Sequence, residues 1–242
     1  MAYGCASAPV RQQTEIPAKY PISEIVKKDV KYPIDAYDPW EGMNRRMYKF
    51  NALFDQYVFL PVVNAYEFIT PGFIETGISN FFNNLHELKP LSNSLLQFKI
   101  KKFGITLSRV LINTTIGVGG VMDVATSLDV PKQNEDFGQT LGFYGVRPGP
   151  YLVLPIFGPS TLRDSGGLVV DTVAYSVMID NILEELIDDN SDEDLAKVAL
   201  TLLDAIDTRH QQSFRYYGTG SPFEYDLIRM LYLKKRQFQI AN

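Results

Sequence analysis

Four short segments of this chain combine a helix-capping residue with an acidic residue three positions later. Two of them, Asp38 to Glu41 and Ser221 to Glu224, also carry proline at the first helical position, and the others run from Thr161 to Asp164 and from Ser191 to Asp194. A capping side chain satisfies a backbone N–H that lacks a partner at a helix start, and proline has no N–H to leave unsatisfied. The four signals predict an all-α chain.

Apolar residues recur at helical spacings in three segments. The series after Asp38 is Met43, Met47, Phe50, Phe54 and Tyr57. The series after Pro71 is Ile74, Ile78, Phe81, Phe82 and Leu85, and the series after Ser191 is Leu195, Val198, Ala199, Leu202, Leu203 and Ile206. Spacings of three and four place these side chains on one face of a helix, so each segment is predicted to be amphipathic. Such a face packs into a soluble core or lies at a membrane surface.

The aromatic content of two of these faces favours a membrane surface. Helices 38–57 and 71–86 are predicted to lie near the membrane plane, because aromatic rings are suited to the boundary between lipid and water. The residues predicted to face the membrane are Phe50, Phe54, Tyr57, Phe81 and Phe82.

A glycine- and proline-rich segment interrupts the helical pattern. The run Gly117 to Gly120 follows a predicted helix at 99–116 and should end it. Residues 131–160 then contain five glycines and five prolines, and no helix is predicted there. The segment is too rich in apolar residues to be disordered, and loops of this length usually carry function. We therefore expect it to pack against another part of the protein.

Composition excludes several kinds of function. Lys and Arg number 23 against 28 Asp and Glu, and the net charge of −5 with a pI near 5.1 argues against a nucleic-acid partner. The two histidines, His86 and His210, and the single Cys5 are too few for a structural zinc site, an iron–sulfur cluster or a disulfide framework. Neither a metal nor a cofactor is expected.

Charge is unevenly distributed in the C-terminal quarter. Residues 184–207 contain nine acidic residues and one basic residue, whereas residues 208–242 contain six basic and two acidic residues. Adjacent helices of opposite sign can pair with each other, or one charged face can meet a partner. Both interpretations stay open at this point.

The sequence lacks the common catalytic motifs. Neither the G-x-S-x-G nucleophile elbow nor the glycine-rich phosphate loop occurs. His86 and His210 are interpreted as structural or surface histidines. Asp164 and Asp171 are seven residues apart and share a helix face, yet the sequence defines no cleft around them. The chain is predicted not to be an enzyme, with no catalytic residues.

No segment is predicted to span a membrane. The longest uncharged run, 148–162, has 15 residues and four prolines, whereas a spanning helix needs about 20 mainly apolar residues. The chain opens Met-Ala-Tyr-Gly-Cys without a basic or apolar leader, which fits a cytosolic protein or a chain whose signal has been removed.

Residues 1–36 are predicted to form an extended tether ahead of a helical domain at 37–242. The tether has four prolines and no sustained apolar period, so it cannot bury enough surface to fold alone. Cys5 lies near its end. Because exposed free thiols are normally avoided, Cys5 is either an attachment point or incidental.

Three long motifs together resemble one protein family. They are the run Asp38 to Asn51, the run Gly138 to Tyr151, and Leu154-Pro155 followed by Thr161 to Asp164. Over about residues 37–215 the chain closely resembles the MlaA (VacJ) family. Members of that family are outer-membrane lipoproteins of Gram-negative bacteria that remove phospholipid misplaced in the outer leaflet and pass it to a periplasmic carrier protein.

The resemblance implies a fold, partners and an anchor. The fold is expected to be a single ring-like helical domain with amphipathic helices and a glycine- and proline-rich hairpin, seated at the periplasmic face of the outer membrane. The implied partners are phospholipid, the outer membrane, a trimeric porin and a periplasmic lipid carrier. Cys5 is implied to be the first residue of the mature lipoprotein, anchored to the membrane by palmitate or similar chains, and the following Ala6 is compatible with outer-membrane sorting.

The resemblance also implies a lipid path, which a hairpin at 138–157 is expected to gate or line. Its glycines permit hinge angles and its prolines stiffen the chain between them. The residues expected at the path are Gly142, Phe143, Tyr144, Gly145, Arg147, Gly149 and Tyr151. Two alternatives stay open: a phospholipase-like hydrolase using Ser or His near this segment, and a scaffold that organises porins without moving lipid.

Overall fold

The computed structural model describes residues 36–186 and 190–241. Its helices, in chain order, are α2 (Glu41–Phe54), the π-helical turn η1 (Asp55–Phe59), α3 (Leu60–Ile69), α4 (Gly72–His86), α5 (Leu88–Leu96), α6 (Ile100–Thr115), α7 (Val124–Ser127), α8 (Phe137–Phe143), α9 (Leu162–Leu186), α10 (Asn190–His210) and α11 (Glu224–Ala241). One small antiparallel sheet pairs β1 (Tyr151–Leu154) with β2 (Gly158–Thr161), in the register Tyr151 to Thr161. The predicted all-α class is confirmed.

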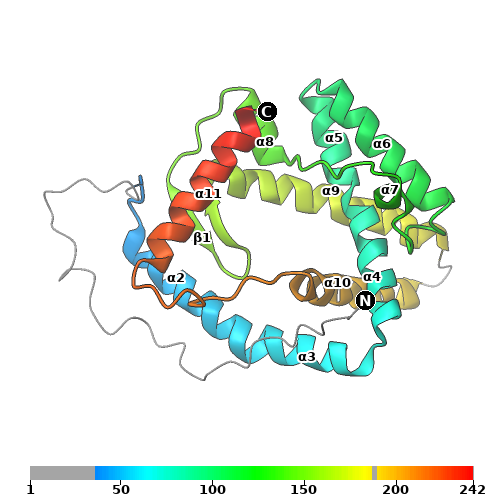
Figure 1. The fold of residues 1–242 in the computed structure, drawn as a ribbon, viewed down its shortest axis with the longest axis horizontal. Coiled ribbons are helices and arrows are strands. Elements are labelled where there is room, and N and C mark those ends of the chain that lie inside the picture. Colours follow the sequence, from blue (N-terminus) through cyan, green and yellow to red (C-terminus); the bar gives the residue numbers. More distant parts are fainter. Residues whose placement is uncertain (1–35, 187–189, 242) are drawn as a thin grey trace, which may run out of the picture.

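The helices follow one another around a ring-like outline (Figure 1). The helix formed by α2, η1 and α3 runs along one side, α4 forms the next, and α5, α6 and α8 lie opposite α3. α11 and the hairpin close the remaining side, and α9 crosses the middle of the view. The tether predicted at 1–36, with Cys5, lies outside the described residues except for Ala36.

Most predicted helices are present with small shifts at their ends. The segment predicted at 71–86 is α4, and the one predicted at 99–116 is α6. After α6 the backbone of Val118, Gly119 and Gly120 has positive φ, which ends the helix. A side chain on Gly120 would meet the side chain of Asn84 at 2.7 Å, so this turn needs glycine for space as well as for angle.

The helix predicted at 38–57 extends further, because α2 continues through η1 and α3 to Ile69. Pro61 lies in the first turn of α3 and has no N–H to donate. The turn before it widens into the π-helical η1, which leaves Asp55 buried on the inner side.

The four helix-start signals have different outcomes. Thr161 behaves as predicted, because its hydroxyl accepts a hydrogen bond from the N–H of Asp164 at 3.2 Å. The box at 38–41 is wrong: Trp40 precedes α2, and the carboxylate of Asp38 instead accepts from Asn44 Nδ2 at 2.7 Å and Arg229 Nη1 at 2.9 Å. A side-chain amide and a charged guanidinium from α11 bind this carboxylate in place of the local N–H groups.

The box at 221–224 is also incomplete. α11 begins at Glu224, but the carboxylate of Glu224 accepts from Tyr48 Oη at 2.7 Å and from Thr219 N at 3.1 Å, not from Ser221 N. The side chains of the fourth signal, at 191–193, lie outside those that the structure describes.

The prediction of no helix in 131–160 is wrong at α8. Asp136 caps this helix by accepting from Gln139 N at 2.8 Å. Gly138 and Gly142 lower helix propensity but permit close packing, since a Cβ on Gly138 would meet Arg236 Nη2 at 2.7 Å and one on Gly142 would meet Ile240 Cδ1 at 2.6 Å. A hairpin is present, but its strands span Tyr151–Leu154 and Gly158–Thr161 rather than 138–157.

The apolar core is small and rich in tyrosine. Tyr48, Tyr151, Val153 and Tyr225 pack together where α2, the hairpin and α11 meet. The rings of Tyr48 and Tyr225 meet edge to face at 5.9 Å. Packing in this core holds the hairpin against α2 and α11.

Candidate functional site

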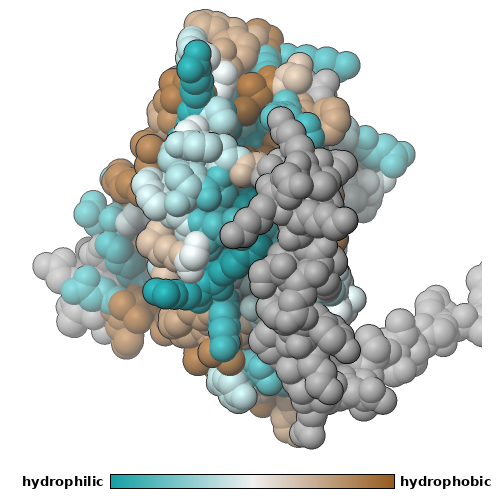
Figure 2. All heavy atoms as spheres, turned by 90° about the vertical axis from the view of Figure 1, so that its left-hand side faces the viewer, coloured by the Kyte–Doolittle hydropathy of each residue, from teal (hydrophilic) through white to brown (hydrophobic). Residues whose placement is uncertain are grey.

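Large apolar side chains are exposed over much of the molecule. The most exposed of them include Phe68 at 90%, Phe73 at 79% and Ile69 at 75%, all near the turn between α3 and α4. Figure 2, which views the side that carries α2 and α11, shows apolar residues at the surface beside a band of hydrophilic ones. Exposed apolar patches of this kind mark contact with membrane or another protein.

In contrast to this apolar surface, the interior contains many charged side chains. Among the described residues the buried charged side chains include Asp55, Glu87, Arg109, Glu135, Arg163, Asp164, Asp207, Arg209, Glu224, Asp226, Arg229 and Arg236. Arg109 is 1% exposed and donates to Glu87 Oε1 at 2.7 Å. Charged residues are seldom fully buried in water-soluble domains. Polar groups turned inward and apolar groups turned outward are typical of a protein surrounded by lipid.

The predicted membrane-facing residues divide into two groups. Phe50 and Tyr57 are exposed, and Phe54 and Phe81 are half-buried. Phe82 is only 2% exposed, so the prediction that it faces outward is wrong. Successive helical residues point about 100° apart, and Phe82 lies on the side of α4 that packs against the rest of the protein. Membrane contact by the exposed residues stays a prediction.

α9 corrects the expectation that no segment could span a membrane. Leu162–Glu185 is long and apolar enough to do so by length and composition, and most of it is exposed. The count of uncharged residues missed it because Asp164, Asp171 and Asp180 interrupt the run. Core helices of soluble proteins meet the same two criteria, so length and composition alone assign α9 no membrane position.

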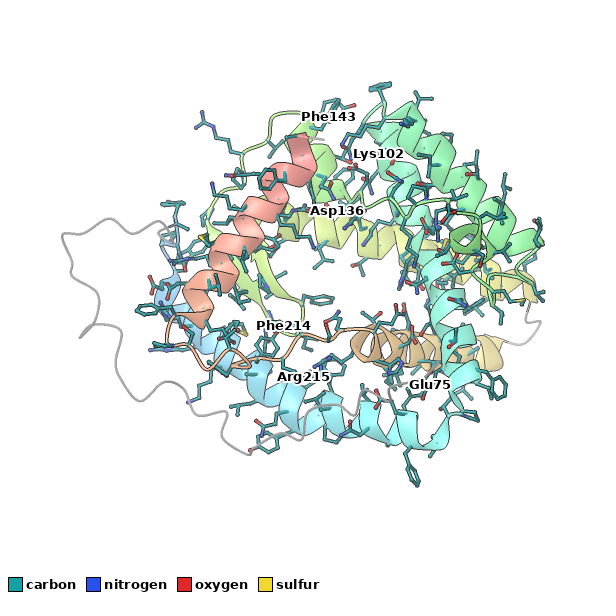
Figure 3. The ribbon with its side chains drawn as sticks, in the orientation of Figure 1. Glu75, Lys102, Asp136, Phe143, Phe214 and Arg215 are labelled. Atoms are coloured by element: carbon teal, nitrogen blue, oxygen red, sulfur yellow. The ribbon has the colours of Figure 1, made fainter. Side chains whose placement is uncertain are left out.

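A polar cavity of about 220 Å³ lies between α5, α8, α9, α11 and the hairpin. Its charged lining residues are Lys89, Asp136, Asp164, Asp171 and Arg236, and its apolar lining includes Leu154, Phe157 and Leu168. Figure 3 labels Asp136 where α8 approaches α9 on the inner side of the ring. The cavity therefore offers both charged and apolar surface to a ligand.

Arg236 holds two of the cavity carboxylates. Its Nη2 lies 2.8 Å from Asp136 Oδ1 and its Nε lies 3.0 Å from Asp164 Oδ2. Burial alone would raise the pKa of Asp136, but hydrogen bonds from Arg236 and Gln139 and the charge of Arg236 lower it to about 2. Burial alone would also raise the pKa of Asp164. The hydrogen bonds and charges of Arg236 and Arg163 outweigh burial, so the pKa of Asp164 is lowered.

The structure does not place the predicted lipid-path residues of the loop at this cavity. Phe143, Tyr144, Gly145, Arg147 and Gly149 are exposed at the outer end of α8 and beyond. The Tyr144 hydroxyl donates to the carbonyl of Leu96 at 2.7 Å. Gly142 is partly buried and faces Ile240 and Arg163.

Tyr151 was predicted to meet acyl tails, and this is wrong. It is 1% exposed and its ring packs against Tyr225 and Tyr232 in the core. The hairpin residues at the cavity are instead Leu154, Phe157, Pro159 and Ser160. The signal that could have found the cavity is the spacing of Asp164 and Asp171, which places both carboxylates on one face of α9.

A second, apolar groove of about 360 Å³ lies between α4 and α10. It is lined by Phe73, Ile74, Gly77, Ile78, Phe81, Phe82, Val121, Leu200 and Leu203. Phe82 therefore contacts apolar neighbours within the protein.

Both histidines lie in ion-pair positions near the surface. His86 Nε2 is 3.1 Å from Asp204 Oδ2, and His210 Nδ1 is 2.8 Å from Glu67 Oε1. Within the part of the chain that the structure describes, no group of three or more His, Cys, Asp or Glu side chains is placed to hold a metal.

The pairing of the acidic 184–207 stretch with the basic 208–242 stretch is not observed for three arginines. Arg209 pairs with Asp55, Arg229 with Asp38 and Asp226, and Arg236 with Asp136 and Asp164. Asp55 lies in η1, Asp164 in α9 and Asp226 in α11 itself, whereas Asp38 precedes α2 and Asp136 caps α8.

Comparison with known proteins decides the family. A family model described as MlaA lipoprotein matches residues 36–239. The chain belongs to the MlaA lipoprotein family. The match begins ahead of α2 and ends within α11, so the resemblance of the three sequence motifs extends into the last helix.

Individual relatives of this chain share about two fifths of the aligned residues. A protein of Escherichia coli (strain K12) named "Intermembrane phospholipid transport system lipoprotein MlaA" is 41% identical over 138 residues, which cover 55% of each chain. An uncharacterised protein of Rickettsia prowazekii (strain Madrid E) is 37% identical over 146 residues, or 60% of this chain and 58% of the relative. The aligned part thus spans less than two thirds of the curated relatives.

A solved structure has a similar fold. A chain described under "Structural basis for maintenance of bacterial outer membrane lipid asymmetry" is 31% identical, with a TM-score of 0.63 over 86% of this chain and 100% of the solved one.

Proposed function

We propose that this chain removes phospholipid misplaced in the outer leaflet of the outer membrane and passes it towards a periplasmic carrier, which maintains lipid asymmetry. The names of the relatives, which describe phospholipid transport and outer-membrane lipid asymmetry, support this function. The observation that carries it is the reversed polarity of the molecule, with exposed apolar side chains outside and buried charges inside.

Moving a phospholipid requires a polar route for its headgroup and an apolar route for its tails. Burying a charged headgroup without polar partners is costly, and exposing acyl tails to water is also costly. The cavity between α9, α11 and the hairpin offers charged residues to a headgroup, and Leu154 and Phe157 to acyl tails. We propose that this cavity is part of the lipid path and that the exposed segment after α8 controls access to it.

No bond is broken in this function, so the chain acts as a conduit rather than an enzyme. In the described residues both histidines lie against carboxylates, Asp204 and Glu67. Among the described residues neither histidine forms a hydrogen bond with a serine, which the hydrolase alternative would need for a histidine to activate a serine.

We further propose a seat at the periplasmic face of the outer membrane, anchored through Cys5 and in contact with a trimeric porin. A single acyl chain binds membranes only weakly, so several chains or additional apolar surface are needed for stable anchoring. The exposed residues of α2, α3 and α4 supply apolar surface of that kind.

The proposal is tested in cells that lack the protein. Outer-leaflet aminophospholipid is measured with an amine-reactive probe that does not cross the membrane, with and without the restored chain. Restoration should lower the outer-leaflet signal, and an unchanged signal contradicts lipid removal. Release of fatty acid by the purified chain would support the hydrolase, and porin assembly that changes without any change in outer-leaflet lipid would support the scaffold.

A further inference from the structure

The ion pairs around Arg236 leave two charged groups at the cavity wall without ionic partners. Arg236 binds Asp136 and Asp164, and Arg163 also binds Asp164, so these four charges balance. The remaining charged lining residues are Lys89 of α5 and Asp171 of α9. Within the described residues neither of them forms an ion pair.

Asp171 is held in place by neutral donors only. Its Oδ1 accepts from Asn93 Nδ2 at 3.0 Å, and its Oδ2 accepts from the N–H of Phe137 at 3.0 Å. Burial raises the pKa of Asp171 despite these hydrogen bonds and the more distant charge of Lys89. A fixed carboxylate with spare lone pairs and no adjacent cation is a binding position for a cationic group.

The backbone of Lys89 is linked to this carboxylate through a shared neighbour. Asn93 Nδ2 donates both to the carbonyl of Lys89 at 3.0 Å and to Asp171 at 3.0 Å, which ties the first turn of α5 to α9. The Lys89 side chain is exposed and lines the cavity, so its ammonium is open to an anion. The wall thus carries one free positive and one free negative charge.

We propose that Lys89 and Asp171 select phospholipids whose headgroup carries a primary amine next to its phosphate, over headgroups that carry only negative charge. The inference rests on the proposed lipid path. The phosphate would lie at Lys89 and the ammonium would donate to Asp171. A headgroup of the phosphatidylglycerol type carries the same phosphate but supplies no cation, so the Asp171 carboxylate stays without a counter-charge.

The experiment measures which lipids the full chain retains. Protein in detergent is equilibrated with mixed vesicles that contain equal parts of phosphatidylethanolamine, phosphatidylglycerol and phosphatidylcholine, repurified, and its bound lipid is quantified by mass spectrometry. The ethanolamine lipid should be enriched about fivefold over the glycerol lipid, as expected from one partly exposed ion pair. Choline lipid should be enriched less than ethanolamine lipid, because its quaternary nitrogen has no N–H to donate.

Variants assign the selection to the two residues. Asp171→Asn should retain lipid but lose the enrichment, Asp171→Glu should keep it, and Lys89→Gln should lower retention of all three lipids. Asp194→Asn and Lys101→Gln change exposed residues outside the cavity and serve as charge-matched controls. Circular dichroism and a melting curve check that each variant folds.

The outcomes separate the inference from the proposed function. If the wild-type chain retains no lipid, the lipid path itself is wrong. If it retains lipid in the proportions of the vesicles, or if a folded Asp171→Asn keeps the enrichment, the selection is overturned and the path stands. Should Asp171→Asn fail to fold, the proportions bound by the wild-type chain still test the selection, and Lys89→Gln against its control Lys101→Gln tests whether this cavity wall carries it.

Discussion

Arg209 at the end of α10 binds Asp55 of the π-helical turn η1, 154 residues earlier in the chain, through two parallel contacts. Arg209 Nη2 lies 2.8 Å from Asp55 Oδ2, and Nε contacts Oδ1. Both side chains are buried, at 10% and 8% exposed. A two-point arginine–carboxylate pair fixes direction as well as distance, so this contact ties α10 to the helix that forms one side of the ring.

Breaking this pair from one side should be strongly destabilising. Asp55→Asn leaves the Arg209 guanidinium buried without a counter-charge. The unfolding free energy should therefore fall by about 3–5 kcal/mol. Chemical unfolding in detergent measures the effect. Glu41→Gln, which removes the more exposed i,i+4 partner of Arg45, is the control and should cost about 0.5 kcal/mol or less. Equal losses in the two variants would show that the buried pair has no special role.

Acid should weaken the protein through Asp136. The pKa of this carboxyl is lowered to about 2 in the folded chain against an ordinary value of 3.8. A lowered pKa contributes stability that is present above about pH 4 and is lost as the pH falls towards 2. The unfolding free energy should fall over that range by on the order of 2 kcal/mol from this group.

The matched variant identifies the source of the acid effect. Asp136→Asn should be less stable at neutral pH and should lose less stability between pH 4 and pH 2 than the wild type. Asp129→Asn, at an exposed position, should follow the wild-type curve. If Asp136→Asn loses as much stability between pH 4 and pH 2 as the wild type, the acid effect comes from other groups. Asp123 is one such group, because hydrogen bonds outweigh burial and lower its pKa to about 2.

The helices could be predicted from sequence because their signal is local. The apolar period of 71–86 suffices for α4, and Gly117 to Gly120 mark the end of α6. Asp38 could not be interpreted this way, since its donors Asn44 and Arg229 include one that lies 191 residues away. Local and long-range partners compete for the same carboxylate, and sequence shows only the local ones.

The candidate site was harder to predict, because residues far apart in the chain form it. Asp164 and Asp171 were noted as a pair on one helix face, but the arginine that binds the first lies in α11. α8 was missed because Gly138 suggests a loop, whereas its missing side chain makes room for Arg236. The tyrosine side chain of Tyr151 is of a type that suits contact with lipid, but in the fold it is buried in the core.

Phe81 and Phe82 should differ in contact with lipid although they are neighbours. Spin labels at Phe50, Tyr57 and Phe81 should be accessible to a lipid-soluble relaxing agent in liposomes, because these side chains are wholly or partly exposed. Phe82→Ala should instead lower the unfolding free energy by about 3–5 kcal/mol, because Phe82 is buried. Protection of all three labels by protein would contradict the membrane-facing assignment.

Cys5 should anchor the mature protein when it is expressed with a lipoprotein signal. Cys5→Ser should release the chain to the soluble periplasmic fraction or leave it unprocessed, because the acyl chains are lost. Fractionation followed by immunoblotting measures this. Full retention of processed Cys5→Ser in the outer membrane would mean that the exposed helix surfaces hold the protein without acylation.

The exposed segment between α8 and β1 should have to move for lipid to pass. A cross-link at its end is geometrically close, because a Cβ on Gly149 would lie 3.1 Å from Leu162 Cβ at the start of α9, and a shift of a few tenths of an ångström brings the pair to the roughly 3.5–4.5 Å found in disulfides. Gly149 has a φ of +69°, so Gly149→Cys adds some strain, and both single cysteine variants are needed as controls. Cys5 is the one native cysteine, and acylation removes it from competition. The double variant Gly149→Cys with Leu162→Cys should lower lipid removal under oxidising conditions and regain it on reduction, whereas Gly149→Cys alone and Leu162→Cys alone should respond to neither. Undiminished lipid removal with the disulfide fully formed would mean that this segment only packs, and that access to the cavity is controlled elsewhere.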